Sequence, residues 1–222
     1  MLQRVPEPEL MDEPEQARAY AAEDFSAPNA LFLERFRQLH PGPLGPARVL
    51  DLGCGPADIC VRLARAYPDC QIDALDGSAA MLVEAAQVLM AAPDVAGRIQ
   101  LVEDLLPSAR LPAAAYDVVI SNSLLHHLGD PAVFWESLRR AARPGAWVLV
   151  MDLFRPESEQ AIDDLVAVHA ADSPAVLRRD FRNSLAAAFT PEEVAEQLRG
   201  AGLAHLVVER VSDRHLTVSG RR

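Results

Sequence analysis

The chain has 222 residues, a length typical of one domain or of one domain with an appended subdomain. Asp and Glu number 32 against 21 Lys and Arg, which gives a formal net charge of −11. An acidic surface repels phosphate backbones and anionic lipid headgroups, so the composition argues against nucleic acid or a membrane as the main partner. No run approaches the roughly 20 apolar residues that a membrane span needs.

The N-terminus and the cysteines indicate the cellular compartment. The first 16 residues are acidic and rich in proline, lack the apolar core of a secretion signal, and predict a mobile arm in a cytoplasmic protein. Cys54, Cys60 and Cys70 form neither a disulfide framework nor a common zinc-binding pattern. We therefore expect reduced, mostly buried thiols and no metal site.

The first half of the chain predicts alternating helices and strands. Apolar residues at helical spacing over 18–39 predict two short helices divided at Pro28, before a break rich in proline and glycine at 40–46. The predicted strands that follow are 48–52, 71–75, 98–102, 116–121 and 146–153. The predicted helices between them are 57–66, 79–92 and 131–142. Five strands separated by helices indicate a parallel sheet with right-handed crossovers.

The last third of the chain predicts helices and then a strand pair. A helical stretch at 157–188 is broken near Ser173 and Pro174. Thr190 then begins another helix as its N-cap, with proline at the first helical position and Glu193 completing a capping box. Strands at 203–208 and 215–218 are separated by only six residues, so we expect them to pair antiparallel.

The strongest local motif is VLDLGCGPAD, residues 49–58, in which a strand enters a glycine turn and then a helix. Such a turn at the end of the first strand borders the ligand crevice of open α/β sheets. A dinucleotide fingerprint needs a glycine where Asp58 stands, and this carboxylate would repel a pyrophosphate. S-adenosylmethionine carries no phosphate, and Asp51 and Asp58 can stabilise its positive groups. From the loop alone, a purely structural turn remains an equal alternative.

Acidic residues also follow the second and third predicted strands. Asp76 lies where a carboxylate accepts hydrogen bonds from a ribose diol. The alternative is a helix N-cap role, for which Ser78 competes. Asp104 lies where a carboxylate can accept from an adenine amino group, and the alternative is a solvated loop acid. Three strand ends that each carry an acid facing one crevice are harder to obtain by chance than any one of them, so together they favour a binding site.

Five segments, in this order and spacing, resemble class I S-adenosylmethionine-dependent methyltransferases that act on small molecules: VLDLGCGPAD, ALDGSAAML, VEDLLP, YDVVISNSLLHHLGDP and LRRAARPGAWVLVMD. The resemblance covers about residues 48–155. It implies an α/β fold with a Rossmann-like, mostly parallel sheet of seven strands in the order 3-2-1-4-5-7-6, whose last two strands are the C-terminal pair. It divides the chain into an N-terminal arm with lid helices at 1–46 and a methyltransferase domain at 47–222, with a helical insertion at about 157–188.

The resemblance also assigns cofactor-binding residues to the matching positions. These are Asp51, Gly53, Cys54 and Gly55 at the methionine part, Asp76, Gly77, Ser78 and Met81 at the ribose and adenine, Asp104 and Leu105 beside the adenine, and Ser121 and Asn122 beside the reacting methyl group. One departure is Ala57, which stands where the family usually has a third glycine. In the lid, Tyr20 and Phe25 are expected to close over the cofactor, with core packing as an equal alternative.

Methyl transfer from a sulfonium is an in-line displacement with a neutral leaving group, so it needs no acid and mainly requires positioning and desolvation. A base is needed only if the acceptor loses a proton. His126 and His127 follow the fourth strand and are the candidate catalytic bases, although one of them is expected to brace the loop. The polar run at 178–184 and the turn at 212–215 are weaker candidates for contact with the acceptor.

Three functions are therefore compared. The leading one is methyl transfer from S-adenosylmethionine to a small molecule, with a protein acceptor left open. The second is an S-adenosylmethionine-binding protein that does not methylate, such as a regulatory subunit. The third, a nicotinamide-dependent oxidoreductase, is disfavoured by Asp58 and by the missing dinucleotide glycine. The sequence leaves the acceptor atom and the oligomeric state open.

Overall fold

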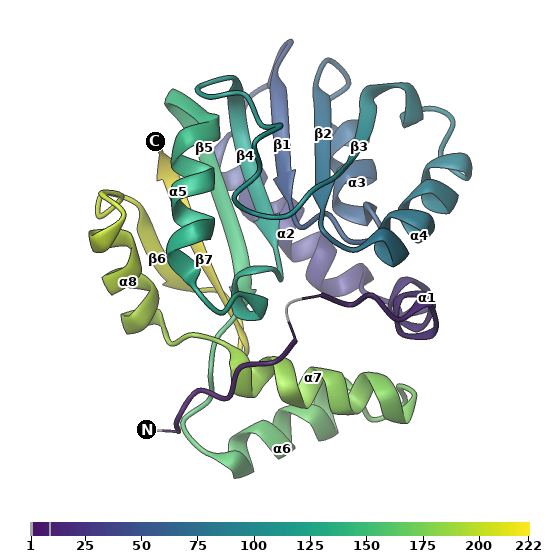
Figure 1. Cartoon of the computed structure of the whole chain (residues 1–222), viewed down its shortest axis with the longest axis vertical. Coiled ribbons are helices and arrows are strands. Elements are labelled where there is room, and N and C mark those ends of the chain that lie inside the picture. Colours follow the sequence, from purple (N-terminus) through teal and green to yellow (C-terminus); the bar gives the residue numbers. More distant parts are fainter. Residues whose placement is uncertain (1, 9) are drawn as a thin grey trace.

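The structure is a computed structural model that describes residues 2–8 and 10–222. Within these residues, seven strands form one sheet in the order β3-β2-β1-β4-β5-β7-β6 (Figure 1), which confirms the predicted Rossmann-like fold. The strands are β1 (Arg48–Leu52), β2 (Gln71–Asp76), β3 (Ile99–Glu103), β4 (Tyr116–Asn122), β5 (Ala142–Leu153), β6 (Val207–Arg210) and β7 (His215–Arg221). The first five are mutually parallel, and β7 runs antiparallel to both β5 and β6.

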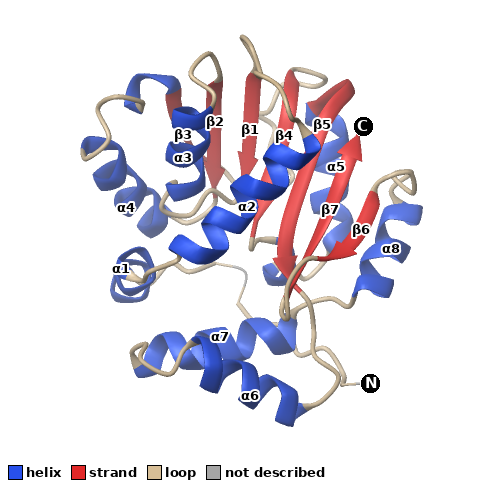
Figure 2. Ribbon diagram, turned by 180° about the vertical axis from the view of Figure 1, so that it is seen from behind, coloured by secondary structure: helices blue, strands red, loops and turns tan. Residues whose placement is uncertain are grey.

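Helices cover both faces of the sheet. The α-helices are α1 (Pro14–Ala22), α2 (Ser26–Leu39), α3 (Asp58–Ala66), α4 (Ala79–Met90), α5 (Pro131–Ala141), α6 (Glu159–His169), α7 (Ala175–Ala187) and α8 (Pro191–Gly200), and the 3-10 turns are η1 (Ala96–Arg98) and η2 (Leu125–His127). Figure 2 shows α2 and α3 on one face, whereas α5 and α8 lie on the other. No helix among the described residues is long and apolar enough to cross a membrane.

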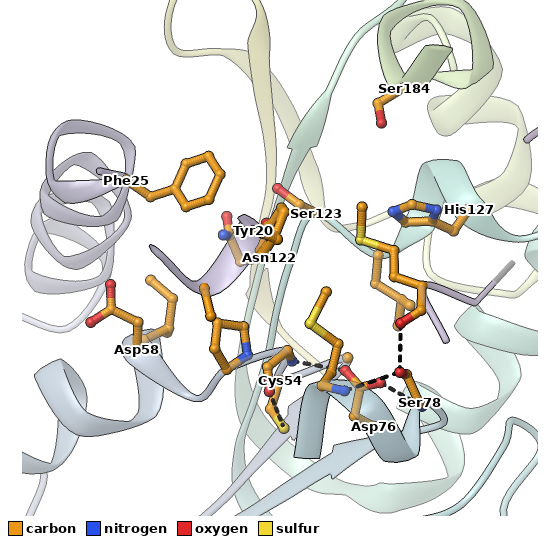
Figure 3. Close-up of a pocket in the computed structure, with 18 of the residues that line it drawn as sticks. Tyr20, Phe25, Cys54, Asp58, Asp76, Ser78, Asn122, Ser123, His127 and Ser184 are labelled. Carbon is orange, nitrogen blue, oxygen red and sulfur yellow. Dashed lines mark hydrogen bonds between the residues drawn. The ribbon is translucent and has the colours of Figure 1, made fainter. Parts of the chain in front are cut away.

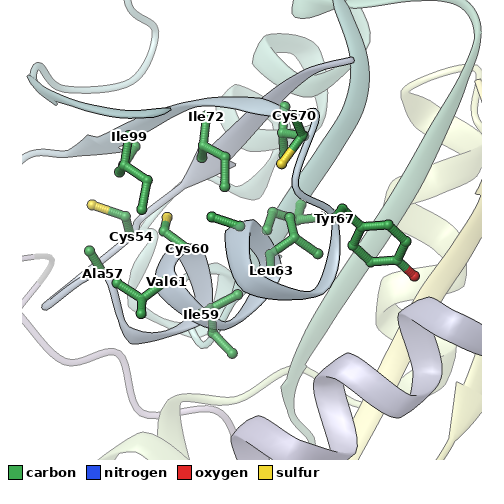
Figure 4. Close-up of a cluster of buried hydrophobic side chains, with 14 of the residues drawn as sticks. Cys54, Ala57, Ile59, Cys60, Val61, Leu63, Tyr67, Cys70, Ile72 and Ile99 are labelled. Atoms are coloured by element: carbon green, nitrogen blue, oxygen red, sulfur yellow. The ribbon is translucent and has the colours of Figure 1, made fainter. Parts of the chain in front are cut away.

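The apolar core on the first face includes the three cysteines. Alternate residues of the central strands meet the apolar stripe of α3, and Cys54, Cys60 and Cys70 lie in this cluster (Figure 4). All three thiols are free and buried, as the sequence predicts. This close packing holds α3 against the sheet, so the glycine turn that leads into α3 is restrained at its helical end.

Two predictions for the N-terminal segment are wrong. The helix break falls at residues 23–25, and Pro28 lies in the first turn of α2, where its missing N–H is not needed. The described part of the arm is held in place: Val5 N donates to Ala186 O across 3.1 Å, and Leu2 O accepts from Arg155 Nε across 3.0 Å. The residues that hold the arm lie on α7 and after β5. They are distant from the arm in sequence, so the composition of the arm does not indicate these contacts.

The C-terminal pair is antiparallel as predicted, but β6 begins later. Residues 203–206 form a turn after α8, because Leu203 N donates to Leu198 O and Leu206 N donates to Leu203 O. The capping box of Thr190 and Glu193 is present at the start of α8. The helical insertion forms two helices, α6 and α7, beneath the carboxyl ends of the parallel strands (Figure 1).

Candidate active site

A cavity of about 430 Å³ lies at the carboxyl ends of the parallel strands, between the sheet, the N-terminal helices and α7 (Figure 3). This is the edge at which open α/β sheets bind ligands. The predicted residues that line the cavity are Tyr20, Phe25, Asp51, Gly53, Cys54, Gly55, Asp76, Gly77, Ser78, Met81, Asp104, Leu105, Asn122, His126 and His127. The predicted Ser121 instead lies inside the sheet, fully buried, and donates to Leu52 O across 2.7 Å.

The glycine turn requires backbone conformations that side chains oppose. Gly53 has φ of +71° and Gly55 has φ of +50°. A Cβ on Gly53 would lie 2.9 Å from the side chain of Leu124. Ala57, at the position of the third family glycine, has φ of +63° although it carries a Cβ. The turn is thus kept in its ligand-cradling shape at some conformational cost.

Asp76 at the end of β2 links the turn to α4. Its carboxylate accepts from Gly55 N and from Ser78 N, each across 2.8 Å, while Ser78 itself is the N-cap of α4. Burial raises the pKa of Asp76, although these backbone hydrogen bonds oppose the rise. Each carboxylate oxygen has a further lone pair to offer, which suits the two hydroxyls of a ribose.

Two buried oxygens at the cavity have no partner among the described residues. They are Asp51 Oδ1 and Asn122 Oδ1. The other oxygen of Asp51 accepts from the Cys60 thiol across 3.0 Å, and burial raises the pKa of Asp51 to about 7. An unpartnered buried acceptor is costly, so both oxygens favour a ligand that brings N–H donors. The amino group of S-adenosylmethionine meets this requirement.

Asp104 lies at the rim of the cavity and is already hydrogen-bonded within the chain. Its carboxylate accepts from Ser108 Oγ across 2.5 Å and from Leu105 N across 3.0 Å. The Ser108 hydrogen bond is the main reason that the pKa of Asp104 is lowered. Leu105 is half exposed and lies over Gly77. These two residues therefore offer a carboxylate and an apolar surface at the same rim.

The first two helices close one side of the cavity (Figure 3). The Tyr20 and Phe25 ring centroids lie 4.7 Å apart, and both residues line the cavity. Burial, followed by nearby carboxylates, raises the pKa of Tyr20 to about 12, so its hydroxyl stays protonated. Asn29 of α2, which the sequence analysis missed, is buried and donates to Asp58 across 2.5 Å.

The histidine pair is held by carboxylates. His126 is buried, and its Nδ1 lies 2.5 Å from Asp152 Oδ1, while Asp152 Oδ2 accepts from Leu125 N. Burial alone lowers the pKa of His126, but the Asp152 and Glu7 carboxylates overcome this and raise it. Burial and the charge of His126 lower the pKa of His127 to about 3, which makes it neutral and a weak base. His126 thus braces the loop after β4.

The N-terminal arm brings residues to the site that no sequence motif marked. Glu7 Oε1 accepts from Ser184 Oγ across 2.9 Å and lies 3.3 Å from His127 Nδ1. Arg4 donates to the carbonyl oxygens of His126 and Leu128 across 2.9 and 3.0 Å. These contacts hold the arm beside the histidine loop, and the arm residues Leu10 and Met11 line the cavity.

The weaker candidates divide between cavity and surface. From the polar run at 178–184, the residues that line the cavity are Asp180, Phe181 and Ser184. Arg182 forms ion pairs with Glu159 and Asp163 on the exposed side of α7. From the turn at 212–215, Arg214 and His215 line the far end of the cavity.

Comparisons with known proteins agree with this geometry. A family model described as a methyltransferase domain matches residues 50–148. An uncharacterized methyltransferase of Mycobacterium tuberculosis is 29% identical over 71% of this chain and 76% of its own length. Trans-aconitate 2-methyltransferase of Mycolicibacterium gilvum is 32% identical over 74% of this chain, and ubiquinone biosynthesis O-methyltransferase of Xylella fastidiosa is 31% identical over 72%. The chain spans only 57% and 62% of the lengths of these last two relatives.

Solved structures share the fold along nearly the whole chain. A putative S-adenosylmethionine-dependent methyltransferase from Methanococcus maripaludis superposes with a TM-score of 0.71 at 17% identity, covering 97% of this chain and 96% of that one. A SAM-dependent methyltransferase from Aquifex aeolicus gives a TM-score of 0.68 at 18% identity, covering 94% and 98%. Sheet order, ordered motifs and the matched family model together identify a class I S-adenosylmethionine-dependent methyltransferase domain in this chain, with S-adenosylmethionine as methyl donor.

Proposed function

We propose that the protein transfers the methyl group of S-adenosylmethionine to a small molecule bound at the α7 end of the cavity. The observation that carries the proposal is the continuity of this cavity, which runs from the glycine turn to residues of α6 and α7. Leu177 and Phe181 give the α7 end apolar surface, and Asp180 and Ser184 give it polar groups. Relatives named for trans-aconitate and for ubiquinone biosynthesis support a small acceptor.

The cofactor is assigned to the strand ends. We infer that Asp51 and Asn122 accept hydrogen bonds from the amino group, and that Asp76 accepts them from the ribose hydroxyls. Gly53 and Gly55 let the backbone approach the methionine part, and Met81 and Leu105 flank the adenine. Tyr20 and Phe25 cover the cofactor from the side of α1, which excludes water from the reacting atoms.

The chemistry asks little of the protein beyond placement. S-adenosylmethionine supplies a methyl group on a sulfonium, whose leaving group departs neutral and needs no acid. The chain contributes by holding the acceptor in line and by excluding water. We assign His126 to positioning of the loop after β4, because Asp152 and Glu7 hold it, and His127 to contact with the acceptor, because its ring lines the cavity.

Nucleic acid and membranes are not proposed as partners. The formal charge of −11 opposes binding to phosphate backbones and to anionic lipid. We infer a cytoplasmic enzyme, because all three cysteines are free thiols, which reducing compartments maintain.

The first experiment titrates the protein with S-adenosylhomocysteine by calorimetry. Asp76→Ala removes two charge-assisted hydrogen bonds to the ribose, so we expect affinity to fall about 100-fold. Asp69→Ala, an exposed carboxylate at the other end of the sheet, is the matched control and should leave affinity unchanged. Equal affinity in wild type and Asp76→Ala would contradict the assigned site.

The acceptor class is tested separately with a cofactor labelled in its methyl group. The enzyme is incubated with a cell extract, which is then divided by ultrafiltration. We expect label in the fraction of small molecules. Label that stays with macromolecules, or that follows RNA or protein after digestion, would contradict a small acceptor.

A further inference from the structure

The arm and the histidine loop bring three metal-binding side chains together. Glu7, His126 and His127 each offer one ligand atom, and these atoms all lie within 4.8 Å of one another. His126 and His127 are neighbours in η2, whereas Glu7 lies far earlier in the chain, so no local motif marks these residues as a metal site. The cluster is largely buried, and both histidines line the cavity at the end assigned to the acceptor.

Two of the three distances between these atoms match a tetrahedral site. Glu7 Oε1 lies 3.5 Å from His126 Nε2 and 3.3 Å from His127 Nδ1. Ligands bound to zinc at about 2.1 Å in tetrahedral geometry lie about 3.4 Å apart. The His126 and His127 ring centroids are 4.2 Å apart, so both rings face the same side of the loop. His127 Nδ1 also lies 3.4 Å from Pro8 O, so a bound cation would have to replace this contact.

Each of two candidate ligands, His126 and Glu7, has a hydrogen-bond partner that orients it, as ligands in metal sites commonly do. His126 Nδ1 faces Asp152 across 2.5 Å, so a proton on Nδ1 donates to the carboxylate and leaves a lone pair on Nε2. Glu7 Oε1 is oriented by Ser184 Oγ across 2.9 Å. With Nδ1 as the donor, the Nε2 lone pair and a Glu7 oxygen face one another.

We propose that Glu7, His126 and His127 bind a divalent transition metal, with Zn²⁺ the best match for two imidazoles and one carboxylate. Three protein ligands would leave a fourth position for a water molecule or an acceptor atom. A metal there would polarise an oxygen or sulfur atom of the acceptor, and this consequence rests on the proposed function. Metal binding itself requires neither the acceptor nor methyl transfer.

The test is a titration of chelator-treated full-length protein with Co²⁺, followed by displacement with Zn²⁺. We expect one equivalent of Co²⁺ with the visible absorption of a four-coordinate site, lost on addition of Zn²⁺. Glu7→Gln and His127→Ala should each weaken binding at least tenfold, as should Asp152→Asn, which acts through His126. His205→Ala removes an exposed histidine between α8 and β6, and is the matched control that should bind normally.

Failure of this proposal is separable from failure of the proposed function. S-adenosylhomocysteine binding is measured on every variant, and its retention shows that the fold is intact. Absence of stoichiometric metal, or metal uptake that Glu7→Gln leaves unchanged, would overturn the site. Metal uptake by a protein that does not bind S-adenosylhomocysteine would instead support the metal site and contradict the cofactor site.

Discussion

The Cys60 thiol of α3 donates a hydrogen bond to Asp51 Oδ2 of β1 across 3.0 Å. It is the one donor that the described residues provide to this carboxylate, because Asp51 Oδ1 has no partner there. Asp51 is 2% exposed, and burial raises its pKa from 3.8 to about 7. A positively charged ligand group would stabilise the ionised form of this poorly solvated carboxylate.

This pKa predicts how stability depends on pH. Between about pH 4 and about pH 7 the folded protein holds a proton on Asp51 that the unfolded chain releases, so the contribution of Asp51 falls as pH rises and is fully lost above about 7. Asp51→Asn cannot ionise. Urea titrations should find the variant more stable than wild type above pH 7, with the difference shrinking toward pH 4. A difference independent of pH would contradict the raised pKa.

Ala57 predicts a stabilising substitution. Its φ of +63° is a conformation in which glycine carries no Cβ penalty, so Ala57→Gly should stabilise the protein by about 1 kcal/mol. Ala64→Gly, in the interior of neighbouring α3, should destabilise it by about 1 kcal/mol or more, because glycine is unfavourable inside helices. Chemical denaturation of both variants tests the opposite signs, and destabilisation by Ala57→Gly would show that the turn prefers alanine.

The ion pair between Arg155 and Glu193 leads us to expect a large loss of stability when the Glu193 carboxylate is removed. Arg155 is buried and donates to Glu193 Oε1 across 2.6 Å and to Ala188 O across 2.7 Å. Glu193→Ala leaves the buried guanidinium without a carboxylate that is itself 42% exposed, and it also removes the hydrogen bond from Thr190 N, so we expect a loss of about 2 kcal/mol. Thr190→Ala removes only the cap of the same helix and should cost about 1 kcal/mol. Equal losses in thermal or urea denaturation would mean that the ion pair adds nothing beyond capping.

Arg4 predicts that the arm controls release of the cofactor. Its guanidinium lies 4.0 Å from the Phe189 ring centroid and bonds the His126 and Leu128 carbonyl oxygens, while Met11 O accepts from Ser78 Oγ at the cofactor end. Arg4→Ala should loosen the arm and raise the dissociation rate of S-adenosylhomocysteine about tenfold in stopped-flow measurements. Arg18→Ala, on the exposed side of α1, is the control. An unchanged rate would separate the arm from cofactor release.

Most of the fold could be predicted because its signals are local. Short apolar runs between helical patterns identified every strand of the sheet, and the capping box of Thr190 and Glu193 marked the start of α8. The predictions were wrong where contacts between residues distant in sequence determine the local structure. Apolar Leu203 and Leu206 suggested a strand, but they pack into the core from a turn. The acidic arm suggested mobility, but Arg4 bonds the histidine loop and Glu7 bonds Ser184 of α7.

The sequence by itself determined the sheet, the glycine turn and the positions of Asp51, Asp76 and Asp104 at three strand ends, because parallel strands necessarily present their carboxyl ends at one edge. Only the tertiary structure decided which groups surround them. Asp152 and Glu7 reach the histidines from β5 and from the N-terminus. Such pairings depend on chain segments that meet only after the sheet and its helices have packed, and no local periodicity records them.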